Sequence, residues 1–184
     1  MNRHLFVVLW MISGAQVGAQ GVVNFSTRAG ATVNAPVTYL GDNTLADGRF
    51  LGQLYAGALN GPLSAVGSPT PFRSDAGKGY ITAGGNVEVP GVLPGETARV
   101  KLVAWAGSLG DTYLEALGRN VCGVGESPVI TIQLGGGTLP PAALAGLSGF
   151  VISLGCPEPS PLAIGLIGAG LLWTCRRQGK RSAR

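Results

Sequence analysis

Between residues 20 and 155, hydrophobic and polar positions alternate over short segments. The clearest alternation covers residues 97–105, TARVKLVAW, in which successive side chains point to opposite faces if the chain is extended. One face carries Ala98, Val100, Leu102 and Ala104. The other face carries Arg99, Lys101, Val103 and Trp105. This pattern predicts a β-strand.

Other segments predict strands because turn-forming residues separate them. We expect strands at residues 22–26, 36–39, 50–56, 80–82, 86–89, 97–105, 128–134 and 150–154. Asn60-Gly61-Pro62 and Pro90-Gly91 are typical breakers, because Gly allows a positive φ and Pro fixes φ for a turn. Residues 111–117, DTYLEAL, indicate a helix of a turn or two. Residues 134–146 are rich in Gly and Pro and predict a loop or spacer.

The number and spacing of these strands indicate the fold class. Short strands with turn signals every eight to twelve residues predict a mainly β domain over residues 20–155. We expect an antiparallel β-sandwich of immunoglobulin-like or jelly-roll type, and we favour it over a barrel.

The first 19 residues have the three-part layout of a secretory signal peptide. Arg3 precedes the apolar run of residues 5–12, and small residues ending Val17-Gly18-Ala19 follow. The run is too short to cross a membrane core of about 30 Å. We expect cleavage after Ala19, with a buried first strand or helix as the alternative.

Residues 156–184 place a Pro-Glu-Pro triplet, an apolar segment and a basic tail in that order. The apolar segment, residues 162–175, has 14 residues without charge. As a helix it would reach only about 21 Å, which is marginal for spanning a membrane. The cations of the tail, residues 176–184, are Arg176, Arg177, Lys180, Arg181 and Arg184. They act as a stop and predict that this end faces the cytoplasm.

The basic tail also explains the isoelectric point of about 9.3. Between Gln20 and Cys156 the basic residues are Arg28, Arg49, Arg73, Lys78, Arg99, Lys101 and Arg119. The acidic ones are Asp42, Asp47, Asp75, Glu88, Glu96, Asp111, Glu115 and Glu126. The body is therefore nearly neutral and has no basic stripe, so we expect no nucleic-acid binding.

Pro157-Glu158-Pro159-Ser160, the glycine-containing apolar segment and the Arg-rich terminus together resemble the PEP-CTERM sorting signal. This signal occurs on many exported proteins of Gram-negative bacteria that make extracellular polysaccharide. The resemblance covers residues 157–184 and implies that Pro157, Glu158 and Pro159 are the recognition motif. It also implies that residues 162–175 are a short, transient membrane helix and that Arg176 and Arg177 begin the basic stop.

The resemblance implies partners and a location as well. Export through the Sec translocon precedes recognition by exosortase, a membrane-embedded cysteine protease-like transpeptidase that removes the helix and tail. Cys156 and Pro161 depart from the usual pattern and leave the scission point open. We expect transient insertion in the inner membrane, then release to the cell envelope or extracellular space. The expected role is structural or adhesive in exopolysaccharide or biofilm. A carbohydrate-binding β-sandwich is the alternative, and a glycosidase comes third.

The mature chain offers few groups for catalysis. The one histidine of the sequence, His4, lies in the predicted signal peptide, so the mature chain has none. This excludes Ser-His-Asp and Cys-His catalysis and every His-based metal site. We therefore expect no enzyme activity, no metal and no cofactor. In an oxidising compartment Cys122 and Cys156 either form a disulfide or stay as thiols.

Three weaker patterns bear on the alternatives. The acids of the body could supply a glycosidase pair, but their polar contexts are typical of solvated surface acids. Residues 41–48, GDNTLADG, carry oxygens that suit Ca²⁺ but lack the EF-hand spacing, which favours a turn-rich loop. A sugar-binding platform would need exposed aromatic residues from the set Tyr39, Tyr55, Tyr80, Trp105 and Tyr113. The apolar strand around Trp105 favours a core position for that residue.

Overall fold

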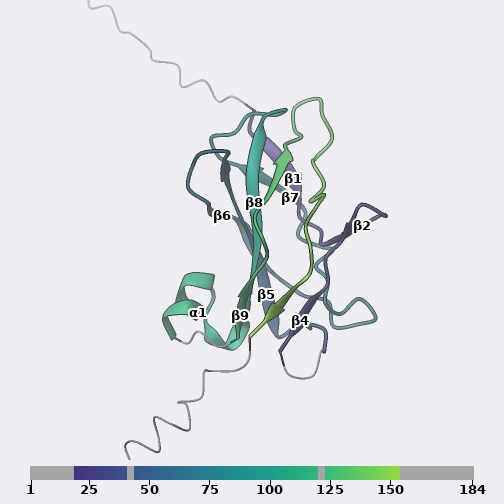
Figure 1. Cartoon of the computed structure of the whole chain (residues 1–184), viewed down its shortest axis with the longest axis vertical. Coiled ribbons are helices and arrows are strands. Elements are labelled where there is room, and N and C mark those ends of the chain that lie inside the picture. The colour runs from purple at the N-terminus through teal and green to yellow at the C-terminus, as the bar shows by residue number, and fades with distance from the viewer. Residues whose placement is uncertain (1–18, 41–43, 120–122, 154–184) are drawn as a thin grey trace, which may run out of the picture.

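The structure, a computed structural model, describes residues 19–40, 44–119 and 123–153 as a mainly β domain. The domain is elongated, with β1 (Gly21–Asn24) near one end of its long axis and β4 (Val37–Tyr39) near the other (Figure 1). Helix α1 (Tyr113–Arg119) lies at the same end as β4. Within the described ranges no helix has the length and apolar character needed to span a membrane. The predicted membrane segment at residues 162–175 lies outside them.

The largest sheet has the strand order β10-β8-β5-β6 and is antiparallel throughout. Its centre is the pair formed by β5 (Phe50–Ala58) and β8 (Thr97–Ala106). Strand β6 (Ser64–Pro71) pairs with the other edge of β5. On the other edge of β8, β10 (Ile130–Gln133) pairs with the first half and β9 (Val124–Glu126) with the second.

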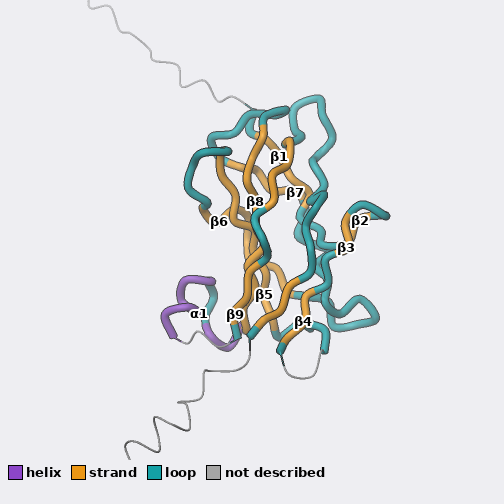
Figure 2. Tube along the Cα trace, in the orientation of Figure 1, coloured by secondary structure: helices purple, strands orange, loops and turns teal. Residues whose placement is uncertain are grey.

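Shorter strands pair with one another beside this sheet (Figure 2). Strand β1 pairs antiparallel with β7 (Asn86–Val89), and β2 (Arg28–Ala29) pairs antiparallel with β3 (Val33–Asn34). Strand β4 pairs in parallel with β11 (Phe150–Ile152), so that the last residues of these two strands lie side by side. A short 3₁₀ turn, η1 (Gly107–Leu109), follows β8.

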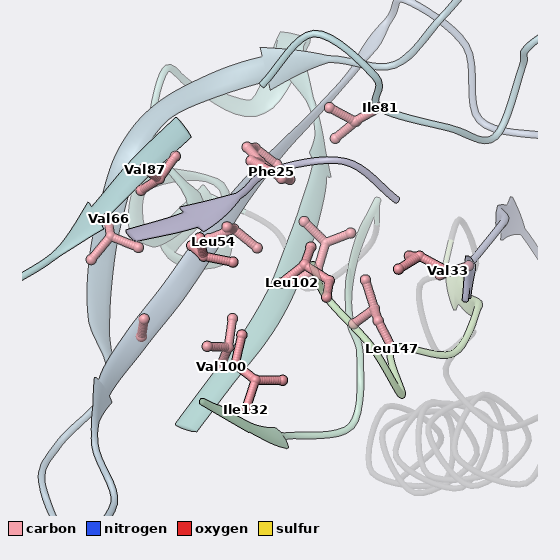
Figure 3. Packing of buried hydrophobic residues seen from close by; sticks show 14 of the residues in the cluster. Phe25, Val33, Leu54, Val66, Ile81, Val87, Val100, Leu102, Ile132 and Leu147 are labelled. Carbon is pink, nitrogen blue, oxygen red and sulfur yellow. The ribbon is translucent and has the colours of Figure 1, made fainter. Parts of the chain in front are cut away.

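The two faces of β8 lie in two hydrophobic clusters, as the alternation over residues 97–105 predicts. The face in the larger cluster carries Ala98, Val100, Leu102 and Ala104, which meet residues of the main sheet and of the shorter pairs (Figure 3). The opposite face carries Val103 and Trp105, which pack with Tyr113 and Ala116 of α1. The predicted strand and its two faces are therefore confirmed, and α1 covers the end of the second face.

Four strands were missed and one expected strand is absent. Strands β2 and β3 are only two residues long, while β6 contains two prolines and a glycine with positive φ, Gly67. Strand β9 is a three-residue segment, and it forms through its pairing with β8. The expected strand at residues 80–82 is wrong, because Ile81 N donates to the hydroxyl of Thr27 over 2.9 Å instead of to a backbone carbonyl.

The expected helix at residues 111–117 is present but begins after Thr112, whose Oγ1 accepts from the N–H of Glu115 over 3.2 Å.

Residues 134–146 contain no strand, and they pack against the domain as a loop. Two leucines of this loop, Leu134 and Leu144, join the larger cluster, as does Leu147 directly after it. The backbone N–H groups of Val22 and Asn24 donate to the carbonyls of Gly135 and Ala142, each over 2.8 Å. Because these bonds tie the loop to β1, the segment is part of the folded unit and not a spacer.

Replacing Thr27 by valine is expected to lower the free energy of unfolding by about 1–2 kcal/mol. Thr27 is fully buried, and valine would fill its space but leave the N–H of Ile81 without the hydroxyl acceptor. Urea denaturation followed by circular dichroism measures the loss. Thr131→Val, at an exposed position of β10, is the matched control and should change stability by less than about 0.5 kcal/mol. A Thr27→Val protein as stable as the wild type would contradict this role of the hydroxyl.

Candidate functional site

The whole predicted sorting signal, residues 156–184, lies outside the described part of the chain. It includes Pro157, Glu158, Pro159, Arg176, Arg177, Lys180 and Arg181. Both cysteines of the predicted disulfide, Cys122 and Cys156, also lie outside the described part. Ala19, the predicted cleavage residue, is described and exposed, and it precedes β1 by two residues. The N–H of Gly123 donates to the carbonyl of Ser153, and the N–H of Ser153 donates to Val124 O over 3.1 Å. The described segments nearest to the two cysteines are therefore joined by backbone hydrogen bonds.

The five aromatic residues considered for a sugar platform do not form one surface. Trp105 and Tyr113 are buried, as expected for Trp105, and Tyr55 packs edge-on against Tyr113 with ring centroids 6.0 Å apart. Tyr80 is half-buried and lies apart from this group, with the guanidinium of Arg28 over its ring at 5.1 Å. Tyr39 is half-buried at the end of β4 and lines a pocket.

This pocket lies where the end of β4, the start of β5 and the end of β8 meet. It has a volume of about 500 Å³ and is lined by Tyr39, Arg49, Phe50, Ala106, Gly107 and Ser108. We call it the Tyr39 pocket. The rings of Tyr39 and Phe50 stack with centroids 5.4 Å apart and an interplanar angle of 29°. Because Phe50 is only 5% exposed, its ring is a fixed support for the ring of Tyr39.

The local sequence explains why Arg49 and Phe50 point to different environments. The N–H of Phe50 donates to the carbonyl of Asp47 over 2.9 Å, which closes a turn immediately before β5. The side chain of Arg49 extends from this turn into solvent and is 71% exposed. Phe50, the first residue of the strand, points into the core. In the register of the sheet Phe50 lies opposite Ala106, which brings the end of β8 to the same place.

The charged part of the pocket is an ion pair two residues apart in sequence. Nε of Arg49 donates to Oδ1 of Asp47 over 2.9 Å, and the backbone N–H of Arg49 donates to the same oxygen over 3.1 Å. These hydrogen bonds lower the pKa of Asp47 below its ordinary value of 3.8, and the carboxylate raises the pKa of Arg49. The pair therefore stays charged through neutral and mildly acidic pH. Nη2 of Arg49 also donates to the hydroxyl of Tyr39 over 3.4 Å, which links the cation to the aromatic ring.

The described acids are spread over the surface. Asp75, Glu88, Glu96, Asp111, Glu115 and Glu126 are exposed, and Asp47 is half-buried. Asp75 forms an ion pair with Arg73, which lowers its pKa, and Glu126 Oε2 accepts from Nζ of Lys101 over 2.6 Å. These placements give no support to the glycosidase alternative.

The candidate Ca²⁺ loop at residues 41–48 is described only from Thr44 onward. In the described part of this loop, the carboxylate of Asp47 accepts a hydrogen bond from Nε of Arg49. In the described ranges, His, Cys, Asp and Glu side chains do not gather in groups of three or more that could hold a metal ion.

Sequence reasoning named Tyr39 but missed Arg49. In the sequence Arg49 is one of several dispersed cations, and its proximity to Tyr39 depends on the pairing of β4 and β5 with other strands. A weak local signal is the order Asp47-Gly48-Arg49 directly before a strand, which is typical of a turn that pairs its own charges.

The arrangement of the Tyr39 pocket suits non-covalent binding, because it joins aromatic and apolar surface to a few polar groups.

Comparison of the chain with protein-family models, with curated proteins and with solved structures gave no match.

Proposed function

We propose that the protein is exported, is sorted through a C-terminal signal of the PEP-CTERM type, and acts in the cell envelope or extracellular matrix. Its role there is structural or adhesive within exopolysaccharide or biofilm. The Sec translocon and exosortase are its processing partners, and the inner membrane holds it only transiently. The observation that carries the proposal is the order of Pro157-Glu158-Pro159, the apolar segment 162–175 and the basic tail, together with a signal-peptide layout at the other end.

The described strands and the described core lie between the two proposed cleavage regions. Strand β1 begins at Gly21, two residues after Ala19, and β11 ends at Ile152, five residues before Pro157. The buried members of the larger cluster lie between Val23 and Ile152.

We also propose that the domain is a β-sandwich of immunoglobulin-like or jelly-roll type. The support is the larger cluster, which joins Leu54 and Leu102 of the main sheet to Val23 and Val87 of the β1–β7 pair. A shared cluster of this kind is what two packed sheets produce. A Cys122–Cys156 disulfide would add a covalent link near β11, beside the hydrogen bonds between Gly123 and Ser153.

Replacing Pro157, Glu158 and Pro159 together by alanine is expected to abolish removal of the C-terminal segment. In a host with exosortase, the intact mass of the wild-type protein should lack the apolar segment and tail, whereas the variant should keep them. Pro161→Ala, next to the motif but outside it, is the matched control and should be processed normally. A triple variant with the same processed mass as the wild type would overturn the sorting proposal.

A second candidate function, carbohydrate binding, is favoured by one specific observation. The ring of Tyr39 is half-buried, is stacked on Phe50 and lines a pocket that also contains a guanidinium group. This function is compatible with export, because an adhesive matrix protein needs a surface that contacts polysaccharide.

A further inference from the structure

We propose that the Tyr39 pocket binds a neutral pyranose residue of a polysaccharide. The inference rests on the second candidate function and gives it a site and a class of sugar. Three properties of the pocket favour such a ligand: its aromatic surface, its hydrogen-bond donors and its charge.

The aromatic surface suits the apolar side of a sugar ring. A pyranose presents C–H groups on its faces and hydroxyl groups at its edge, so one face can lie on an aromatic ring while the edge stays polar. Tyr39 offers such a ring, and its stacking on the buried Phe50 fixes the orientation before any sugar arrives. The volume of about 500 Å³ falls in the range of roughly 300–1,000 Å³ that is usual for small-ligand pockets.

The hydrogen-bond donors lie beside this ring. Arg49 uses Nε for Asp47 and one Nη2 hydrogen for the Tyr39 hydroxyl. A guanidinium carries five N–H groups, so the N–H groups not used in these two bonds can donate to neighbouring hydroxyl groups of a sugar. The exposed Ser108 lies at the same pocket and adds a hydroxyl that can donate or accept.

The backbone beside the pocket is held in place by its own bonds. The N–H of Gly107 donates to the carbonyl of Arg49 over 2.9 Å, and this bond ties η1 to the turn before β5. Ser108 and Arg49 therefore keep a fixed spacing across the pocket. Pre-organised polar groups reduce the entropy that is lost on binding.

The charge of the pocket favours a neutral sugar over a uronic acid. Among the described residues that line the pocket, Arg49 is the one that carries a charge, and its guanidinium is already paired with the carboxylate of Asp47. A carboxylated sugar would gain little attraction from a guanidinium that Asp47 already neutralises, and it would bring a second negative charge close to that of Asp47. A neutral hydroxyl edge meets neither cost.

The binding test uses the exported, processed protein and a panel of neutral hexasaccharides built from glucose, mannose or galactose, with oligogalacturonate as the acidic comparison. Isothermal titration calorimetry gives the dissociation constant of each. We expect at least one neutral hexasaccharide to bind, and Tyr39→Ala to weaken that binding at least tenfold. Tyr39→Phe, which keeps the ring, should lose less than threefold.

Two further variants separate the site from the fold. Tyr80→Ala removes another half-buried tyrosine outside the pocket and should leave binding unchanged. Arg49→Ala removes a side chain that is mostly exposed, so the protein should fold normally while binding weakens severalfold. The melting temperature of each variant shows that the fold is intact.

The outcomes are distinguishable. Absence of binding to every neutral hexasaccharide, or equal binding by the wild type, Tyr39→Ala and Arg49→Ala, would overturn the proposed site. Binding of oligogalacturonate in preference to the neutral sugars would overturn the proposed sugar class. None of these results would affect the sorting proposal, because that proposal is tested by the intact mass of the processed chain.

Discussion

Replacing Trp105 by alanine should lower the free energy of unfolding by about 3–5 kcal/mol, the largest loss that we expect from a single substitution. The indole is fully buried and packs against Tyr113 of α1, with ring centroids 6.1 Å apart. Its Nε1–H donates to the carbonyl of Gly110 over 2.9 Å. The substitution would therefore create a cavity and remove a hydrogen bond to the loop that leads into the helix. Both effects destabilise the contact between α1 and β8.

The loss is measured by urea denaturation of the processed protein, followed by far-UV circular dichroism. Leu114→Ala is the matched control, because Leu114 lies on the same helix but is 68% exposed. It should change the free energy of unfolding by no more than about 0.5 kcal/mol. A loss below about 1 kcal/mol for Trp105→Ala would show that α1 does not depend on this side chain.

Replacing Gly135 by alanine is the second large effect, with an expected loss of about 3 kcal/mol, near the upper end for overpacking. A Cβ at this position would overlap the backbone carbonyl oxygen of Pro140 and would lie 2.8 Å from the Cα of Pro141. Neither atom can rotate away as a side chain could. The loop would have to leave β1, where Gly135 and Val22 exchange two backbone hydrogen bonds of 2.8 and 3.0 Å.

Hydrogen exchange makes this second prediction specific to the loop. Faster exchange is expected at the amides of Val22 and Asn24, which donate to the loop. Gly118→Ala is the matched control, because no described residue outside the helix backbone comes within 4 Å of a Cβ there and alanine favours the helix by up to about 1 kcal/mol. Unchanged exchange at Val22 in Gly135→Ala would mean that the loop accommodates the methyl group.

The strands that could be predicted are those whose own side chains alternate. Residues 97–105 form β8 with the two faces that the sequence indicates, because small and aliphatic side chains occupy every second position. Strand β6 could not be predicted, since its Ser, Gly and Pro residues have little strand preference and it forms by pairing with β5. The failure at residues 80–82 has the opposite origin. The segment around Ile81 has strand-forming residues, but the hydroxyl of Thr27 takes the place of a pairing carbonyl.

The candidate site was predictable only in part for a similar reason. Tyr39 could be named as a residue that would matter if exposed, because aromatic residues are few in this chain. Its partner Phe50 and the ion pair of Arg49 with Asp47 depend on the turn before β5 and on the meeting of three strand ends. Such proximity between separate segments leaves no trace in local alternation. The stacking geometry and the pocket therefore had to come from the structure.

The parallel pairing of β4 with β11 has a mechanical consequence if the protein adheres to polysaccharide while its C-terminus is still held at the membrane. Tyr39 ends β4 and lies opposite Ile152, which ends β11, and the N–H of Leu40 donates to the carbonyl of Ile152 over 2.9 Å. A tensile load between a sugar on Tyr39 and the C-terminal attachment would act on this pair of strands and on the hydrogen bonds that join Ser153 to Gly123 and Val124. Strands β1 and β7, near the far end of the long axis, would bear none of it (Figure 1). The domain would then be loaded at the end that carries Tyr39 and Ile152, and the core residues nearest to the load would be Val37 and Ile152 of this strand pair.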